Sequence, residues 1–255
     1  MSNGVLDRIL QSKQAELPAL RRRRLPAPPP LRPTDLERAA GQPLRLIAEI
    51  KRRSPSAGPL STRLTVAARA AAYERAGAHM MSVLCDGPFF DGSYEDLAVA
   101  RRATRLPVLC KEFVLDECQL DAARAYGASA VLLIVRCLTP QRLRVLVREA
   151  RARELLPFVE VVTEDEASLA LDCGATCIGV NARDLDTLTM DMDRARRVLG
   201  QLPANVTRAH LSGIASPAAV RDVAESAVVA ALIGEVLMRQ DDPEPLLREL
   251  VAAAR

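Results

Sequence analysis

Tryptophan is absent from this 255-residue sequence, and aromatic residues together make up 3% of it. Proteins that bind single-stranded nucleic acid stack the bases on aromatic side chains, so this composition argues against such a platform. An excess of positive charge is also missing, because 35 Lys and Arg stand against 32 Asp and Glu for a net charge of +3. That balance creates no broad field for nucleic acid or for a membrane surface. We therefore exclude nucleic acid as the main partner and expect any anion site to be local.

Long apolar runs are lacking as well. No segment approaches the roughly 20 consecutive apolar residues that cross a bilayer, and residues 1–24 contain no continuous apolar core of the secretory type. We expect a cytoplasmic protein without a membrane-spanning segment. The length alone would allow two domains, but single α/β barrels commonly reach this size, so one catalytic domain is expected.

Clustered metal ligands are a third absence. The six cysteines, at positions 85, 110, 118, 137, 173 and 177, show no C-x-x-C spacing, and the sequence has two histidines. Zinc sites use closely spaced Cys and His ligands, usually four of them. Most of these cysteines lie in or beside apolar runs, where a free thiol behaves as a small core residue. We expect no metal site.

The N-terminal segment combines an amphipathic pattern with a stiff connector. Apolar residues recur at near-helical spacing over Ser2–Leu20, which predicts a helix. A basic run, Arg21–Arg24, follows and is read as a solvated helix end, because four charges make only a weak patch. The Pro-rich stretch Leu25–Pro30 cannot continue a helix. We expect residues 1–43 to form a helix and connector that pack on one end of a barrel made by residues 44–255.

From residue 44 onward one pattern recurs: a short apolar run, a turn, and an Ala-, Leu- and Arg-rich segment of helical period. The predicted strands are 44–51, 80–85, 107–113, 130–135, 157–162, 177–181, 206–212 and 229–234. The predicted helices are 65–76, 94–103, 116–126, 140–154, 164–172, 192–199, 217–226 and 243–254. Strands that are apolar on both faces and alternate with helices predict a closed parallel (β/α)8 TIM barrel. A doubly wound open sheet is the alternative, but no G-x-G-x-x-G follows the first strand.

Capping residues mark the boundaries of these elements. Helix-starting side chains stand at Ser93, Thr139, Thr163 and Ser216. Glycine suits the left-handed position just after a helix, and Gly-Ala pairs occur at Gly77, Gly127 and Gly174. The capping pattern supports alternating helices and strands.

Polar residues gather where the predicted strands end. Glu49 and Lys51 are two apart, so they project from the same face of the first strand. Alone, this pair could be an ordinary ion pair at a strand end. Barrel enzymes, however, build their sites at the carboxyl ends of the strands, and the other ends carry Lys111, Glu160, Asn181, Arg183, Ser212–Gly213 and Gly234–Glu235. The set predicts one charged catalytic mouth, and the glycines of the last two ends predict a phosphate site.

Five motifs, taken in order, resemble the indole-3-glycerol phosphate synthase family of tryptophan biosynthesis. They are residues 48–56 (AEIKRRSPS), 89–93 (FFDGS), 106–113 (LPVLCKEF), 178–185 (IGVNARDL) and 234–239 (GEVLMR). The resemblance runs over nearly the whole chain. It implies a (β/α)8 barrel that closes the indole ring of 1-(2-carboxyphenylamino)-1-deoxyribulose 5-phosphate with loss of carbon dioxide and water. It implies no metal or organic cofactor.

The resemblance also implies roles for individual residues. Lys111 looks like the general acid of ring closure, Glu160 and Lys51 look like the pair that manages dehydration, and Glu49 would orient both lysines. The implied substrate contacts are Asn181 for hydroxyl groups, Arg183 for the departing carboxylate and Ser212 at the end of the seventh strand. The implied aromatic-ring pocket is formed by Phe113, Leu109, Leu132 and Phe90. The implied phosphate pocket is formed by Ser54, Gly213, Gly234 and Glu235.

One departure from the family pattern concerns the seventh strand. The family usually has Glu-Ser-Gly at its end, whereas this chain has Leu211-Ser212-Gly213. A carboxylate expected to face the substrate is thereby replaced by an apolar side chain, and its loss should lower the pKa of nearby lysines. Val236 likewise stands where the family often has Ser. We expect an active but slowed enzyme.

Three other functions fit parts of the sequence. The first is a paralogue of specialised metabolism that acts on a related substrate. The second is a catalytically impaired barrel retained as a binding subunit, and the third is a phosphoribosyl isomerase, whose chemistry leaves the charged set unexplained. We expect a monomer that acts on a small phosphorylated substrate and can associate with other enzymes of the tryptophan pathway.

Overall fold

The computed structural model describes residues 4–34, 36, 42–184 and 186–255. Three parts of the predictions lie outside the described residues. These are Ser2 at the start of the predicted N-terminal helix, positions 35 and 37–41 of the connector, and position 185 at the end of the 178–185 motif.

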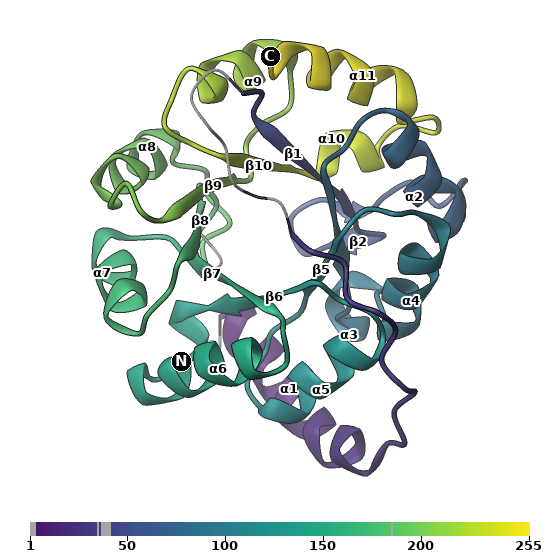
Figure 1. Cartoon of the computed structure of the whole chain (residues 1–255), viewed down its shortest axis with the longest axis vertical. Coiled ribbons are helices and arrows are strands. Elements are labelled where there is room, and N and C mark those ends of the chain that lie inside the picture. The colour runs from purple at the N-terminus through teal and green to yellow at the C-terminus, as the bar shows by residue number, and fades with distance from the viewer. Residues whose placement is uncertain (1–3, 35, 37–41, 185) are drawn as a thin grey trace.

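Eight parallel strands close into a barrel among the described residues (Figure 1). Around the barrel they follow the order β1, β10, β9, β8, β7, β6, β5, β4. Their bounds are β1 (Arg45–Ile50), β4 (Met80–Leu84), β5 (Val108–Lys111), β6 (Ala130–Ile134), β7 (Leu156–Val161), β8 (Cys177–Asn181), β9 (Thr207–Leu211) and β10 (Ala230–Ile233). The predicted (β/α)8 barrel is confirmed, and the open doubly wound alternative is wrong.

The helices that surround the barrel begin and end close to the predicted residues. They are α2 (Val66–Arg75), α4 (Tyr94–Ala103), α5 (Glu117–Ala125), α6 (Pro140–Ala152), α7 (Glu164–Asp172), α8 (Met192–Gln201), α9 (Pro217–Ala224) and α11 (Glu244–Ala253). Each predicted cap accepts a hydrogen bond from the backbone N–H three residues ahead: Ser93, Thr139, Thr163 and Ser216. The three glycines expected after helices have positive φ: Gly77, Gly127 and Gly174.

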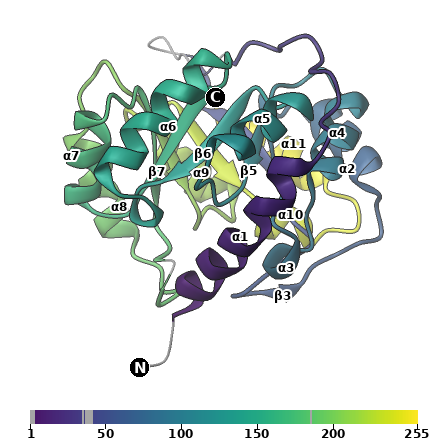
Figure 2. The ribbon, with the colours of Figure 1, turned by 90° about the horizontal axis from the view of Figure 1, so that it is seen from below.

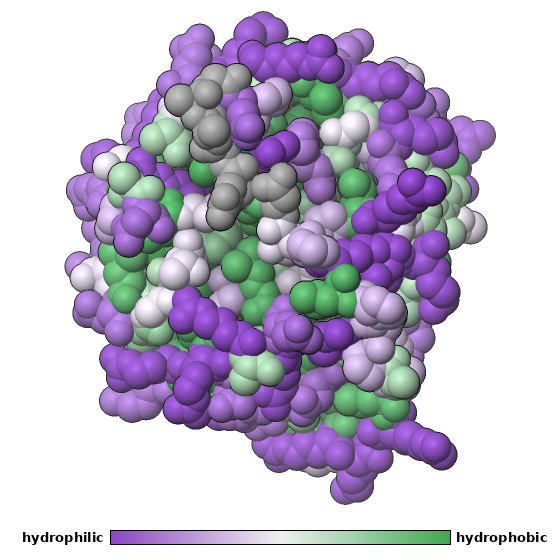
Figure 3. All heavy atoms as spheres, viewed as in Figure 1, coloured by the Kyte–Doolittle hydropathy of each residue, from purple (hydrophilic) through white to green (hydrophobic). Residues whose placement is uncertain are grey.

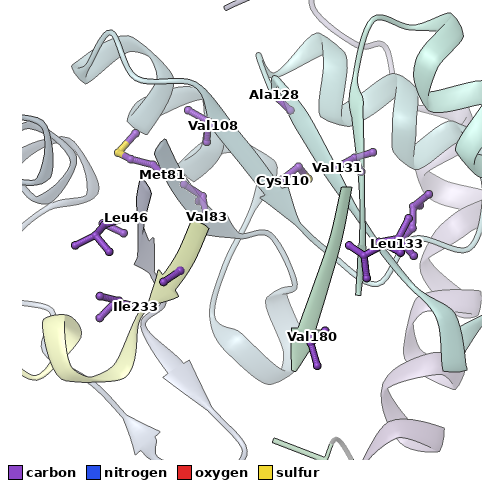
Figure 4. Packing of buried hydrophobic residues seen from close by; sticks show 14 of the residues in the cluster. Leu46, Met81, Val83, Val108, Cys110, Ala128, Val131, Leu133, Val180 and Ile233 are labelled. Atoms are coloured by element: carbon purple, nitrogen blue, oxygen red, sulfur yellow. The ribbon is translucent and has the colours of Figure 1, made fainter. Parts of the chain in front are cut away.

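Two apolar layers form because successive strand residues point to opposite faces. On β6, Val131 and Leu133 belong to the layer between strands and helices, while Leu132 belongs to the cluster inside the barrel. Figure 4 shows Val131 and Leu133 with other members of the outer layer on neighbouring strands. Because both strand faces are covered, the barrel is a packed core, and apart from single buried polar residues such as Ser82 and His210 its strand interiors are apolar.

Short extra elements lie after several strands, where the sequence predicted only turns. They are the hairpin β2 (Arg53–Ser54) and β3 (Gly58–Pro59), the helical turns α3 (Gly87–Phe90) and α10 (Glu235–Met238), and a 3-10 turn η1 (Val135–Cys137). All follow the carboxyl ends of barrel strands, so they build the rim of the mouth.

Helix α1 (Val5–Arg22) precedes the barrel and extends two residues beyond the predicted end at Leu20. Figure 2 shows it running obliquely from beside α5 toward the end of the barrel that carries α3 and α10. Its buried residues Leu6 and Ile9 join the same apolar cluster as Phe113 and Leu132. The N-terminal helix is therefore in place and packs at the barrel mouth.

The outer surface is mainly polar. In Figure 3 hydrophilic residues dominate the periphery of the visible face, and hydrophobic residues gather toward its middle. Among the described residues, Met190 is the single large hydrophobic side chain that counts as exposed, at 39%. No helix in the described ranges is both long enough and apolar enough to cross a membrane.

Candidate active site

A cavity of about 430 Å³ opens at the carboxyl ends of the barrel strands. Its volume lies in the range of small-molecule sites. Fourteen of the sixteen predicted site residues line it: Glu49, Lys51, Ser54, Phe90, Lys111, Phe113, Leu132, Glu160, Asn181, Arg183, Ser212, Gly213, Gly234 and Glu235. The topology thus brings to one place residues that lie up to 186 positions apart in the sequence.

Two predicted substrate contacts, Leu109 and Leu211, lie elsewhere. Both are fully buried in the apolar cluster inside the barrel and are not among the residues that line the cavity. Leu109 is two residues before Lys111, so it occupies the same inward face one step deeper. The side chain of Leu211 lies over Gly179, where an added Cβ would be 2.7 Å from Leu211 Cδ1. In this structure both leucines support the cavity from below.

A cluster of four charged side chains occupies the centre of the mouth. Lys51 Nζ lies 2.8 Å from Glu49 Oε1, so the two side chains lie side by side as expected, with Lys51 just beyond the end of β1 at Ile50. Lys111 Nζ lies 3.3 Å from Glu49 Oε2 and 4.0 Å from Glu160 Oε2. The carboxylates of Glu49 and Glu160 are both almost completely buried. The cluster therefore alternates acid and base, with buried carboxylates and lysines that are 16% and 17% exposed at the cavity.

The pKa values of this cluster follow from burial and neighbouring charges. Burial favours the neutral form of Glu49, but the ammonium groups of Lys51 and Lys111 outweigh it and lower the Glu49 pKa to about 2. Burial would likewise lower the pKa of Lys111, yet Glu49 and Glu160 raise it above its ordinary value. The carboxylates of Glu49 and Glu160 account for this rise, and the effect of a leucine in place of an acid at position 211 stays a prediction.

Glu160 is held from the opposite side by a chain of hydrogen bonds. Asn181 Nδ2 donates to Glu160 Oε1 at 2.8 Å, and Ser212 Oγ donates to Asn181 Oδ1 at 2.7 Å. Ser212 has a φ of 70°, an uncommon conformation for a residue other than glycine, and this hydrogen bond helps to hold it. Glu160 Oε2 has no hydrogen-bond partner among the described residues. One oxygen of this carboxylate is thus fixed, and the other is available to a substrate.

Gly234 has a role that its sequence context does not reveal. A Cβ at this position would lie 2.5 Å from Glu49 Oε1, too close for any side chain. The glycine was expected because backbone N–H groups can approach an anion there. The structure adds that only glycine leaves room for the Glu49 carboxylate in its ion pair with Lys51.

Side chains at the predicted phosphate end are already paired. The carboxylate of Glu235 lies 2.8 Å from Arg239 and 3.7 Å from Arg183. Its charge is therefore balanced, and its pKa is lowered, first by the hydrogen bond from Arg239. Ser54 Oγ accepts a hydrogen bond from the N–H of Ala57 within the β2–β3 turn. Arg239 also lines the cavity; it stands in the 234–239 motif, but the sequence analysis gave it no role.

The apolar wall of the cavity includes residues of helix α1. Val5, Leu6 and Ile9 line it, together with Phe90 and Phe113, whose ring centroids are 6.0 Å apart. The sequence predicted that the helix packs at one barrel end but did not assign it to the site. Its apolar stripe was the available signal, although such a stripe normally indicates only packing.

Comparison with known proteins gives a consistent result. The model of the family described as indole-3-glycerol phosphate synthase matches residues 6–250. Curated proteins named indole-3-glycerol phosphate synthase include one from Exiguobacterium sp. strain AT1b, 42% identical over 87% of each chain. Another, from Mycobacterium ulcerans, is 40% identical over 98% of this chain and 94% of its own length.

Solved structures of low sequence identity share the fold alone. The 3-hexulose-6-phosphate synthase of Salmonella typhimurium superposes with a TM-score of 0.66 at 14% identity, over 83% of this chain and 98% of its own. Thiamine phosphate pyrophosphorylase of Pyrococcus furiosus gives a TM-score of 0.63 at 19% identity, over 83% of this chain and 95% of its own. These matches support the barrel architecture and carry no functional argument.

Proposed function

The chain belongs to the indole-3-glycerol phosphate synthase family, and we propose that different charged residues of the barrel mouth carry out the ring closure and the dehydration of the family's reaction. It is a carboxy-lyase of tryptophan biosynthesis that acts on a small phosphorylated substrate. The reaction joins an aromatic ring carbon of 1-(2-carboxyphenylamino)-1-deoxyribulose 5-phosphate to the ketone carbon and then releases carbon dioxide and water. It requires a proton donor at the ketone oxygen and groups that later remove a proton and expel the hydroxyl group.

Lys111 is the proposed proton donor. The observation that carries this assignment is its position between Glu49, at 3.3 Å, and Glu160, at 4.0 Å. Both carboxylates raise its pKa, so the ammonium group is fully protonated at neutral pH. A protonated lysine held between two carboxylates can stabilise and then protonate the oxygen as the ring closes.

Glu160 and Lys51 are assigned to dehydration. Glu160 Oε1 is fixed by Asn181, whereas Oε2 has no hydrogen-bond partner among the described residues and lies 4.0 Å from Lys111 Nζ. A carboxylate with one free oxygen can accept a proton from the ring-closed intermediate. Lys51, held at 2.8 Å by Glu49, can assist the leaving hydroxyl group. Glu49 acts on both lysines and orients them.

Substrate groups are distributed around this centre. Asn181 and Ser212 offer hydrogen bonds to the sugar-derived hydroxyls, and the planar guanidinium of Arg183 can hold the departing carboxylate. The phosphate is assigned to Ser54 and to the backbone around Gly213, Gly234 and Glu235, where the Glu235 carboxylate is neutralised by arginines. Phe90, Phe113 and Leu132 form the aromatic pocket, with Leu109 beneath it. No metal or organic cofactor is assigned a role.

Two finer assignments concern the whole molecule. We propose that the chain acts as a monomer in the cytoplasm, since the described surface has one exposed large hydrophobic residue, Met190. Large exposed apolar patches are typical of stable interfaces. Transient association with other tryptophan-pathway enzymes stays compatible with this surface. Light scattering of the purified chain measures its mass and tests the monomer directly.

We further propose that residues 1–43 form one unit with the barrel, because α1 lines the same cavity.

The activity is tested by following the fluorescent indole product from the carboxyphenylamino substrate. We expect product formation by the purified chain in the presence of a chelator, with one carbon dioxide released per indole. A chain that binds the substrate without forming indole would instead be an impaired binding subunit. Preference for a ring-substituted substrate would indicate the specialised paralogue.

A further inference from the structure

A buried lysine on helix α1 stands at the centre of a second ion-pair cluster, which borders the cavity through its member Glu112 and is separate from the four charged side chains of the mouth. Lys13 is 2% exposed, and its Nζ lies 2.9 Å from Asp86 Oδ1 and 3.3 Å from the carboxylate of Glu112. Glu16, on the same helix, lies 2.8 Å from the same nitrogen at the solvent edge. Burying charges costs several kcal/mol per ion unless they are well paired. An apolar residue would fill this place without the free-energy cost of burying a charge. Packing alone therefore does not explain the lysine.

Each partner of Lys13 is connected to a different part of the cavity wall. Asp86 Oδ2 accepts a hydrogen bond from the N–H of Phe89 and caps α3, the turn that carries Phe90. Glu112 lies between Lys111 and Phe113 in the sequence, and its Oε1 accepts a hydrogen bond from the N–H of Phe113 at 2.7 Å. The rings of Phe90 and Phe113 are neighbours in the apolar wall.

Helix α1 supplies the third part of that wall. Leu6, Ile9 and Lys13 are spaced by three and four residues, so they lie on one face of the helix. Leu6 and Ile9 line the cavity, and Lys13 enters the cluster one turn further along. Apolar contacts alone are not directional and would tolerate small rotations of the helix. Ion pairs of defined geometry fix its rotation and its position along its axis.

We propose that Lys13 is a positioning residue for substrate binding, which joins helix α1, the α3 turn and the end of β5 into one rigid wall for the aromatic part of the substrate. The inference rests on the proposed function, because that function places the aromatic ring at this wall. Lys13 touches no reacting atom in this account. It acts through Leu6, Ile9, Phe90 and Phe113.

The electrostatics of the cluster agree with this role. Burial opposes the charge on Lys13, but Glu112 and Asp86 outweigh it and hold its pKa above the ordinary value. Burial and Asp86 raise the pKa of Glu112 to about 7, against the lowering effect of Lys13. Tyr94 of α4 and the thiols of Cys85 and Cys110 also face this region. Lys13 therefore stays charged throughout the neutral range and keeps the connection between the three segments.

The variant Lys13→Met tests the proposal, with Arg21→Ala as a matched control. Arg21 also joins α1 to the barrel, through an exposed ion pair with Asp116, but it lies at the far end of the helix from the cavity. We expect Lys13→Met to raise KM about tenfold and to change kcat less than about threefold, the pattern of lost binding common to ground state and transition state. Arg21→Ala should leave both constants within about twofold. Lys13→Arg, which keeps the charge, should restore much of the affinity.

A double variant, Lys13→Met with Glu112→Gln, keeps the test informative if Lys13→Met is too unstable to study. It removes one carboxylate that would be left unpaired, so stability should largely return while KM stays raised. Hydrogen exchange of residues 5–22 gives a readout that does not depend on activity. Exchange should accelerate in Lys13→Met and in the double variant. Wild-type protein that shows protected α1 amides but no synthase activity would contradict the proposed function. The role of the Lys13 ion pairs in holding α1 on the barrel would still stand.

Two results would overturn the inference. One is a folded Lys13→Met or double variant whose KM equals that of the wild type. The other is an equal rise of KM in Arg21→Ala, which would show that any loosening of the helix has the same effect.

Discussion

Lys111 Nζ and Glu49 Oε2 lie 3.3 Å apart inside the barrel mouth, which joins the ends of β5 and β1 through one ion pair. Glu49 is also bound to Lys51, and its backbone carbonyl accepts a hydrogen bond from the buried Tyr73 hydroxyl at 3.1 Å. A single carboxylate thus fixes two lysines from a well-anchored strand. In this arrangement burial and the neighbouring carboxylates together set the pKa of the proton donor, Lys111.

Glu49→Gln should shift the pH dependence of turnover. The Glu49 carboxylate raises the pKa of Lys111, so its removal lowers that pKa. Because the general acid must be protonated, the alkaline limb of the kcat profile should move to lower pH. In steady-state rates measured from pH 6 to 10 the wild type should show no alkaline fall from Lys111, because its pKa lies above the ordinary value of 10.5, whereas the variant should show one. An unmoved limb in a folded variant would mean that another group limits the rate at high pH.

Glu160→Gln should lower the rate of dehydration without lowering the stability of the fold. The amide can keep the contact with Asn181 but cannot take up a proton, so kcat should fall about 10²- to 10⁴-fold. Thermal unfolding should show no loss of stability, since a buried charge is removed. Wild-type turnover in this variant would rule out Glu160 as the proton acceptor.

Leu211→Glu examines the departure from the family pattern. If the missing acid slows the enzyme, its return should raise kcat, whereas the isosteric amide Leu211→Gln should not. The side chain replaces a fully buried leucine over Gly179, so stability should drop by about 2 to 4 kcal/mol. Urea unfolding and steady-state kinetics on both variants provide the measurement. Unchanged turnover in a folded Leu211→Glu variant would show that no carboxylate is needed at this position.

Glu112→Gln should change how stability depends on pH. The pKa of Glu112 is raised to about 7 in the folded protein, above the ordinary value of 4.5. Its stabilising effect is therefore present in full below pH 4.5 and is lost as pH rises through 7. Relative to the variant, the wild type should lose on the order of 2 to 3 kcal/mol over this window. Urea midpoints at intervals across it test the slope, and parallel curves for the two proteins would refute the raised pKa.

Much of the fold could be predicted from local patterns. Strands apolar on both faces, caps such as Ser93 and glycines such as Gly77 each act within a few residues, so the eight strand bounds agree with the structure to within two residues. The short rim elements were missed because two- to four-residue pieces have no periodicity to detect. Pro107–Phe113 was predicted too long, since Glu112 turns back to accept the N–H of Phe113 and the strand ends at Lys111.

The site was predictable to the extent that strand ends converge in a barrel. Alternation placed Glu49 and Lys51 on the same face, but it could not say how deep a side chain lies. Leu109 was expected in the aromatic pocket and Leu211 at a position that faces the substrate, and neither lines the cavity. Contacts across the fold carried no local signal. The cluster of Lys13 with Asp86 and Glu112 spans 99 positions, and the steric need for Gly234 arises from Glu49 on another strand.

The most direct test of the account is the single-turnover rate of Lys111→Ala with enzyme in excess over substrate. We predict that the fluorescent indole product does not form on the timescale of the wild-type reaction, while the substrate still binds through its phosphate and aromatic ring. Single-turnover formation of indole at a rate near that of the wild type would contradict the assignment of Lys111 as the proton donor.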